Sequence, residues 1–100
     1  MTSLAYKLRV PDEIASVLRG LHPHLKKKIK ASLKLILASP DSGKALRDEL
    51  AGLRSFRVAR LRIIYRVRKN VIEIVAVGPR ERIYEETFLI LKRERSRPSP

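Results

Sequence analysis

The stretch FRVARLRIIYRVRKNVIEIVAVGPRERIYEE, residues 56–86, decides the fold of this chain. Over residues 61–68, apolar side chains occupy one parity and arginines most positions of the other, a period of two that is typical of a β-strand. Residues 71–77 are almost all apolar, as expected of a strand covered on both faces. Lys69 and Asn70 form a tight turn between these strands, and residues 56–58 precede them as another strand. The stretch therefore predicts a three-strand antiparallel meander.

Two helices are predicted upstream of the meander. Residues 4–10 alternate weakly, which indicates a short N-terminal strand. Pro11 suits the first position of a helix, and apolar residues at helical spacing extend it over residues 11–20. Pro23 begins a second helix that ends near residue 38, because the residue before Pro40 avoids helical angles. Two helices joined by a few residues form an antiparallel hairpin, and residues 40–53 are rich in turn formers and predict a loop.

A short C-terminal helix is predicted from Tyr84, Phe88 and Leu91, which recur every three or four residues. The order is β-α-α-β-β-β-α, an α+β fold. We expect a two-layer sandwich in which the helical hairpin covers one face of the sheet and the other face is partly open, with Arg62 and Arg66 on it. In this interpretation residues 1–92 are a single domain and residues 93–100 a disordered basic tail.

The charge of the chain restricts the partners that suit it. Lys and Arg number 23 against 10 Asp and Glu, so the net charge is +13 and the pI is about 11.0. Such an excess attracts nucleic acid, an anionic membrane surface or an acidic protein. There is no cysteine, which excludes disulfides and thiolate chemistry, and no apolar run is long enough to span a bilayer. We expect a soluble cytoplasmic protein that does not bind membranes.

Metal and cofactor chemistry have little support in the sequence. The only histidines, His22 and His24, lie in the turn between the predicted helices without a carboxylate at ligand spacing. The glycines are too far apart for a phosphate loop. We therefore expect neither a metal nor a cofactor. The basic run of the second helix either faces solvent or binds phosphates without sequence preference. Its candidate RNA-binding residues are Lys26, Lys27 and Lys30.

The arginines of the meander form the sharper hypothesis. Arg57, Arg62 and Arg80 carry planar, permanently charged guanidinium groups suited to bidentate contact with phosphate. Tyr84 follows Arg80 by one helical turn and is a candidate general base toward a ribose 2′-hydroxyl, with the arginines stabilising the phosphorane. Alternatively, Tyr84 anchors the helix on the sheet and the arginines only solubilise the protein. Two further arginines are candidate RNA contacts: Arg60 and Arg66.

Two blocks carry a resemblance to a known family. LRDELAGLRSFRVARLRIIYRV (residues 46–67) resembles the central signature of the RelE/ParE toxin superfamily, and VAVGPRERIYEE (residues 75–86) is similar to its last strand and its Arg–Tyr ending. The resemblance implies the toxin of a type II toxin–antitoxin system. In the RelE branch, it implies metal-independent cleavage of mRNA in the ribosomal A site by attack of the 2′-oxygen; in the ParE branch, it implies poisoning of DNA gyrase. It also implies an acidic antitoxin as partner.

The resemblance assigns roles to particular residues. Arg62 and Tyr65 match the Arg-x-x-Tyr strand motif, whose tyrosine is mainly core, and Arg80 and Tyr84 match the family's final arginine and tyrosine. Arg57 falls at the first of two strand lysines of RelE-type nucleases, and Ala59 falls at the second. We therefore expect a RelE-like, ribosome-dependent mRNA endoribonuclease; the alternatives are a ParE-like gyrase inhibitor and a non-catalytic RNA-binding protein.

Overall fold

The computed structural model describes residues 6–96 and contains the expected elements in the expected order. The three-strand meander and the three helices are confirmed. The predicted loop over residues 40–53 also contains a two-residue strand and one turn of 3-10 helix, η1. The elements are β1 (Lys7–Arg9), α1 (Asp12–Arg19), α2 (Pro23–Ala38), β2 (Lys44–Ala45), η1 (Asp48–Leu50), β3 (Arg54–Val58), β4 (Leu61–Arg68), β5 (Val71–Pro79) and α3 (Arg80–Ser96).

The strands form one sheet in the order β1-β5-β4-β3-β2. Neighbouring strands from β2 to β5 pair antiparallel. β1 lies at the edge of the sheet opposite β2 and pairs in parallel with β5. The parallel pairing is possible because the α1–α2 hairpin carries the chain back across the sheet before β2 begins. In the turn between β4 and β5, the left-handed φ of 54° belongs to Lys69, whereas the sequence favoured Asn70 for such a conformation.

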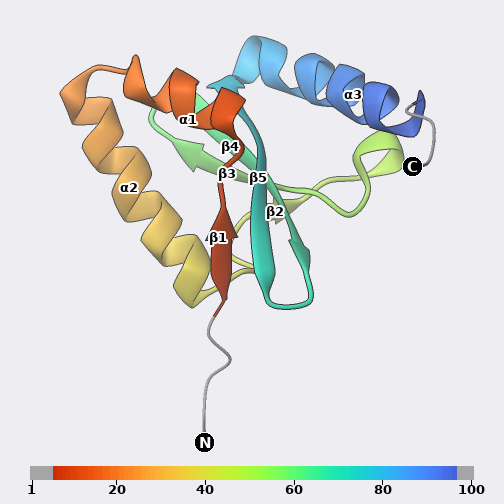
Figure 1. Cartoon of the computed structure of the whole chain (residues 1–100), viewed down its shortest axis with the longest axis horizontal. Helices are drawn as coiled ribbons and strands as arrows, with labels where there is room; N and C mark the ends of the chain where they lie inside the picture. The colour runs from red at the N-terminus through yellow and green to blue at the C-terminus, as the bar shows by residue number, and fades with distance from the viewer. Residues whose placement is uncertain (1–5, 97–100) are drawn as a thin grey trace, which may run out of the picture.

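The helical hairpin packs on one face of the sheet, as the two-layer prediction requires (Figure 1). Ile29 and Ile36 of α2 are buried there against side chains of one parity from the central strands: Val58, Ile63, Tyr65, Ile72 and Ile74. Their burial stabilises the fold by about 25 cal/mol for each Å² of apolar surface removed from water. This core fixes which parity of each strand faces away from the hairpin, and that second parity carries Arg57, Arg62 and Arg66.

The other face of the sheet is covered in part by α3, which is longer than the short helix expected from the sequence (Figure 1). Ile83 packs with Ile64, Val75 and Ala76 in a second cluster on this face. An irregularity in the pairing at Ile64 and Tyr65 lets the neighbouring residues 75 and 76 both join that cluster. Residues 93–96, expected in a disordered tail, instead continue α3, and residues 97–100 lie outside the described residues.

Tyr65 fixes the loop between α2 and β2. Its side chain is fully buried, in agreement with the core role inferred for it. Its hydroxyl donates to the carbonyl of Pro40 at 2.7 Å and accepts from the backbone N–H of Gly43 at 2.9 Å. A Cβ at Gly43 would lie 2.6 Å from that hydroxyl oxygen, so only glycine fits there. Over residues 6–96, no helix is both long and apolar enough to cross a membrane.

Candidate active site

Two cations, Arg57 and Arg62, lie across the sheet on the face that carries α3, and we call them the arginine row. Arg57 of β3 lies directly opposite Arg62 of β4, and Arg62 lies opposite Gly78 of β5. Arg57 has the same parity as Ser55, whose hydroxyl contacts Tyr84 of α3. Arg62 has the same parity as Ile64, which packs with Ile83 of α3. Like charges directly opposite each other on adjacent strands are destabilising. The fold therefore places two arginines directly opposite each other on adjacent strands, at a cost in stability.

No carboxylate offsets this pair within the described part of the chain. Three ion pairs occur over residues 6–96, and none involves Arg57, Arg62 or Arg80. The side chain of Arg57 is exposed, and its Nε makes only a long hydrogen bond of 3.4 Å to the carbonyl of Ala59. Unpaired guanidinium groups on an open face bind phosphate or carboxylate through charge-assisted hydrogen bonds. The row therefore has the chemistry of an anion site.

Tyr84 approaches this row from α3. Arg80 is the first residue of the helix, two residues after Gly78, and Tyr84 lies on the same side one turn later. The hydroxyl of Tyr84 is 3.2 Å from the hydroxyl of Ser55. Ser55 precedes Arg57 by two residues on β3 and therefore lies next to it on the same face. Tyr84 is partly buried against the second cluster, so it anchors the helix and also holds its hydroxyl on the arginine face.

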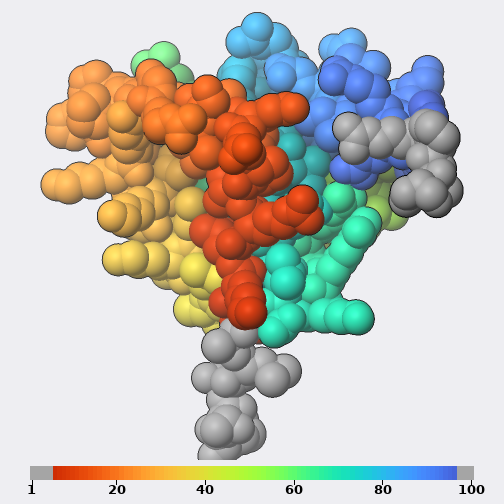
Figure 2. All heavy atoms as spheres, viewed as in Figure 1, coloured from red at the N-terminus to blue at the C-terminus, as the bar shows by residue number. Residues whose placement is uncertain are grey.

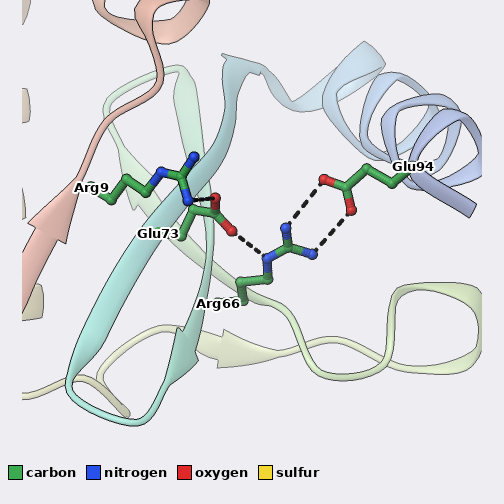
Figure 3. A network of polar contacts seen from close by, with 4 residues as sticks. All are labelled: Arg9, Arg66, Glu73 and Glu94. Atoms are coloured by element: carbon green, nitrogen blue, oxygen red, sulfur yellow. Dashed lines mark hydrogen bonds and ion pairs between the residues drawn. The ribbon is translucent and has the colours of Figure 1, made fainter. Parts of the chain in front are cut away.

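Arg66, predicted as a flanking RNA contact, is committed to an internal network (Figure 3). Its Nε donates to Glu73 at 2.6 Å and its Nη2 to Glu94 at 3.1 Å, and Arg9 joins Glu73 from the other side at 3.5 Å. Burial lowers the pKa of Arg66, but the hydrogen bonds and charges of Glu73 and Glu94 outweigh it and raise the pKa above its usual value. These contacts leave Arg66 little capacity to bind a phosphate.

A groove lies beside this network, at the far end of α3 from the arginine row. This groove of about 930 Å³ runs between the first turn of α1, β5 and the last turns of α3. The paired residues Arg9, Arg66, Glu73 and Glu94 line it, together with charged residues outside these ion pairs: Asp12, Glu13, Lys92 and Arg93. In the arginine row, Arg57 is exposed and Arg62 is half-buried, and neither lines this groove.

The remaining predicted contacts are dispersed. Arg60 is exposed in the turn between β3 and β4, next to the arginine row. Lys26, Lys27 and Lys30 are exposed on α2. That helix lies on the opposite side of the sheet from α3 (Figure 1). These lysines and the arginine row therefore face different sides of the molecule.

The structure corrects the register of β3. Val58 pairs with Leu61, so Ala59 and Arg60 are the two central residues of a tight turn, and Ala59 has a left-handed φ of 55°. Ala59 is therefore not a strand position. The two residues of β3 that face α3 are Ser55 and Arg57, and the position without a cation is Ser55. Sequence reasoning missed Ser55 because Ala-Arg lacks the Gly, Asn or Asp that marks such a turn, although its parity with Arg57 was a usable signal.

Comparison with known proteins identifies the family of this chain. A model described as the ParE toxin of type II toxin–antitoxin system, parDE, matches residues 6–84. The chain belongs to the RelE/ParE toxin superfamily. It is thus a type II toxin by family, which confirms the resemblance seen in the two sequence blocks. No curated protein sequence matches the chain.

Solved structures of RelE and ParE toxins share the fold. A double mutant of Escherichia coli RelE in the free state is 23% identical, with a TM-score of 0.72 over 89% of this chain and 97% of that one. The RelBE2 toxin–antitoxin complex from Mycobacterium tuberculosis is 28% identical, with a TM-score of 0.67 over 76% and 99%. The chromosomal ParDE system of P. aeruginosa is 16% identical, with a TM-score of 0.62 over 77% and 98%. Both branches are therefore represented among the structural neighbours.

Proposed function

We propose that this toxin is a ribosome-dependent mRNA endoribonuclease whose active site is the arginine row with Tyr84. The observation that carries the proposal is the pair Arg57 and Arg62, held opposite each other without a carboxylate, beside a tyrosine hydroxyl on the same face. Such an arrangement is costly for the fold and suits a phosphate that passes through a more highly charged transition state.

The proposed catalytic groups are side chains of this site. Tyr84, as general base, takes the proton of a ribose 2′-hydroxyl, and the 2′-oxygen attacks the adjacent phosphorus. The bond to the 5′-oxygen of the next nucleotide breaks, leaving a 2′,3′-cyclic phosphate, and the 5′-oxygen takes a proton from water to give a 5′-hydroxyl. Arg57, Arg62 and Arg80 stabilise the charge that develops on the phosphorane oxygens. Ser55 holds the Tyr84 hydroxyl through the contact of 3.2 Å.

Induced expression with primer extension on a reporter mRNA tests this activity. We expect cuts at codons in the ribosomal A site with the wild type. Tyr84→Phe should reduce cleavage by about 10²–10⁴-fold, the usual contribution of a general base, and Arg62→Gln should also impair it. Arg93→Gln removes an exposed cation near the end of α3 and is the matched control, with cleavage unchanged. Growth arrest without A-site cuts would contradict the proposal.

A ParE-like gyrase inhibitor is the second candidate function. Two observations favour it. The family model that matches is that of the ParE toxin. Ser55, which with Arg57 faces α3 from β3, is uncharged. A supercoiling assay with purified gyrase separates the two functions. Inhibition that survives Tyr84→Phe supports the ParE-like function, because gyrase inhibition needs no general base. A non-catalytic RNA-binding protein, the third alternative, would show neither cleavage nor toxicity.

We further propose an acidic antitoxin as partner in the cytoplasm. The M. tuberculosis and P. aeruginosa relatives were solved as toxin–antitoxin systems, and a net charge of +13 favours association with an acidic protein. Coexpression of an acidic protein encoded beside the gene should restore growth.

A further inference from the structure

The five lysines of α2 are left without a role by the arginine site. Residues 14–40 contain no Asp or Glu, so nothing within this part of the sequence balances them. Within residues 6–96, none of the three ion pairs involves α2. All five are exposed: Lys26, Lys27, Lys28, Lys30 and Lys34. This charge distribution differs from that of α3, whose cations are interspersed with Glu81, Glu85, Glu86 and Glu94.

Helix geometry gathers three of these lysines on the outer face. Ile29, Ser32 and Ile36 are buried and define the side of α2 that faces the sheet. At 100° per residue, Lys27, Lys30 and Lys34 all fall within a narrow stripe on the opposite side. Lys30 and Lys34 are about 6 Å apart along the axis, at a rise of 1.5 Å per residue. Like charges at this spacing destabilise a helix by about 0.2–0.5 kcal/mol per pair, so the stripe has a cost in the free protein.

We propose that the outer face of α2 is a second polyanion-binding surface, which takes the phosphate backbone of a nucleic acid independently of the arginine row. The two surfaces lie on opposite sides of the sheet, so one phosphate strand cannot lie across both at once (Figure 1). In Figure 2 the side chains of α2 project freely from the left edge of the molecule. The surface is thus open to a partner that is too large for a pocket.

A nucleic-acid backbone fits this stripe better than a membrane does. An interfacial helix inserts an apolar face into the lipid, whereas the apolar face of α2 packs against the sheet and only Leu35 of its large apolar side chains is mostly exposed, at 58%. The exposed face of α2 has no Trp, Tyr or Phe to anchor it in lipid. Lysines in a row neutralise phosphates as point charges and read no bases, so we expect binding without sequence preference. The inference rests on the proposed function only in taking a nucleic acid as the partner.

Fluorescence anisotropy with a labelled RNA duplex, titrated at several salt concentrations, tests the proposal. The α2 variant carries Lys27→Gln, Lys30→Gln and Lys34→Gln; glutamine has a helix propensity close to that of lysine, so the helix should persist. The control carries Lys92→Gln, Arg93→Gln and Arg95→Gln on exposed positions of α3 and loses the same net charge. Circular dichroism checks that both variants fold.

We expect the α2 variant to bind at least 10-fold more weakly at 0.1 M salt. The slope of log affinity against log salt concentration should fall by about 2–3, at about 0.9 for each phosphate that the variant no longer neutralises. The control should bind less than 3-fold more weakly than the wild type. A DNA duplex of equal length should behave like the RNA. Equal weakening in the two variants would mean that only net charge matters, and this would overturn the proposal.

Two further arms distinguish the α2 surface from the arginine row and from a surface that binds lipid. Arg57→Gln with Arg62→Gln should abolish cleavage but retain the salt-dependent binding through α2. If the wild type does not cleave RNA at all, the proposed activity fails while this comparison still tests the α2 surface. Binding to vesicles containing phosphatidylserine is the membrane arm. An equal weakening of vesicle and duplex binding in the α2 variant would overturn the assignment to nucleic acid.

Discussion

Tyr65 shows how one side chain stabilises a loop at a distance from the site. Its hydroxyl has two backbone partners inside the protein, Pro40 and Gly43, and both would lose their bond if the oxygen were removed. Ser55 has a comparable role nearer the arginine row, where its buried hydroxyl contacts Tyr84. In both cases a single polar atom determines where a neighbouring segment lies.

Tyr65→Phe should lower the free energy of unfolding by about 1–3 kcal/mol, because the part-buried carbonyl of Pro40 and the buried N–H of Gly43 lose their partner. Urea denaturation followed by circular dichroism measures this change. Gly43→Ala should also destabilise the protein, since the new Cβ would meet the hydroxyl at 2.6 Å. Part of that cost should disappear in the Tyr65→Phe background. Fully additive effects would show that the two residues do not interact.

Among the elements, α3 is attached to the sheet by two unlike contacts. Its first half is held by Ile83 and Thr87, both fully buried. Its second half is held by Ile90 and Leu91, which pack against the second cluster, and by the bond from Arg66 to Glu94, in which the side chain of Arg66 is 13% exposed. Loss of the ion pair should therefore loosen the second half of α3 while the buried residues of the first half stay in place.

Glu94→Gln should increase amide hydrogen exchange in the last turns of α3 while leaving exchange in β4 and β5 unchanged. The neutral side chain loses the attraction of the guanidinium, and the helix end then opens more often. Hydrogen exchange with mass spectrometry resolves the peptides concerned. Glu86→Gln, at an exposed position of α3, is the matched control and should have no effect on exchange there. Faster exchange throughout the sheet would indicate global destabilisation and contradict this local role.

Across the whole molecule, cations are distributed on two faces that the sheet separates. The arginine row lies on the face of α3, and the lysines of α2 lie on the other face (Figure 1). A net charge of +13 repels itself in the compact state, and the repulsion is concentrated where like charges are neighbours. Anions should therefore stabilise the fold, and most strongly where their geometry matches that of the cations.

Phosphate should raise the melting temperature more than chloride does at equal ionic strength, because it binds Arg57 and Arg62 in addition to screening them. Differential scanning fluorimetry measures the difference. Arg57→Gln with Arg62→Gln should reduce it, whereas Lys92→Gln with Arg93→Gln should not. Phosphate also stabilises proteins by exclusion from their surface, and this effect should be the same in both variants. Equal responses in the two variants would count against an anion site at the arginine row.

Local patterns were enough to predict the meander, the helical hairpin and the family. Alternation over residues 61–68 and the apolar run that follows depend on side chains near in sequence, so they are visible without coordinates. Strand parity predicted that Arg62 faces away from the helical hairpin, whereas the place of Tyr84 was inferred from its helical spacing to Arg80 and from the family resemblance. The extent of α3 was underestimated because residues 92–96 are polar and carry no apolar periodicity.

The sequence by itself determined the order of the main helices and strands, the alternation of residues 61–68 and the excess of cations, because each depends on residue type and spacing. Only the tertiary structure decided that β1 lies in parallel beside β5, that Arg66 is paired with Glu73 and Glu94, and that Ser55 rather than Ala59 faces α3. These three outcomes depend on contacts between residues distant in sequence, which local periodicity does not encode.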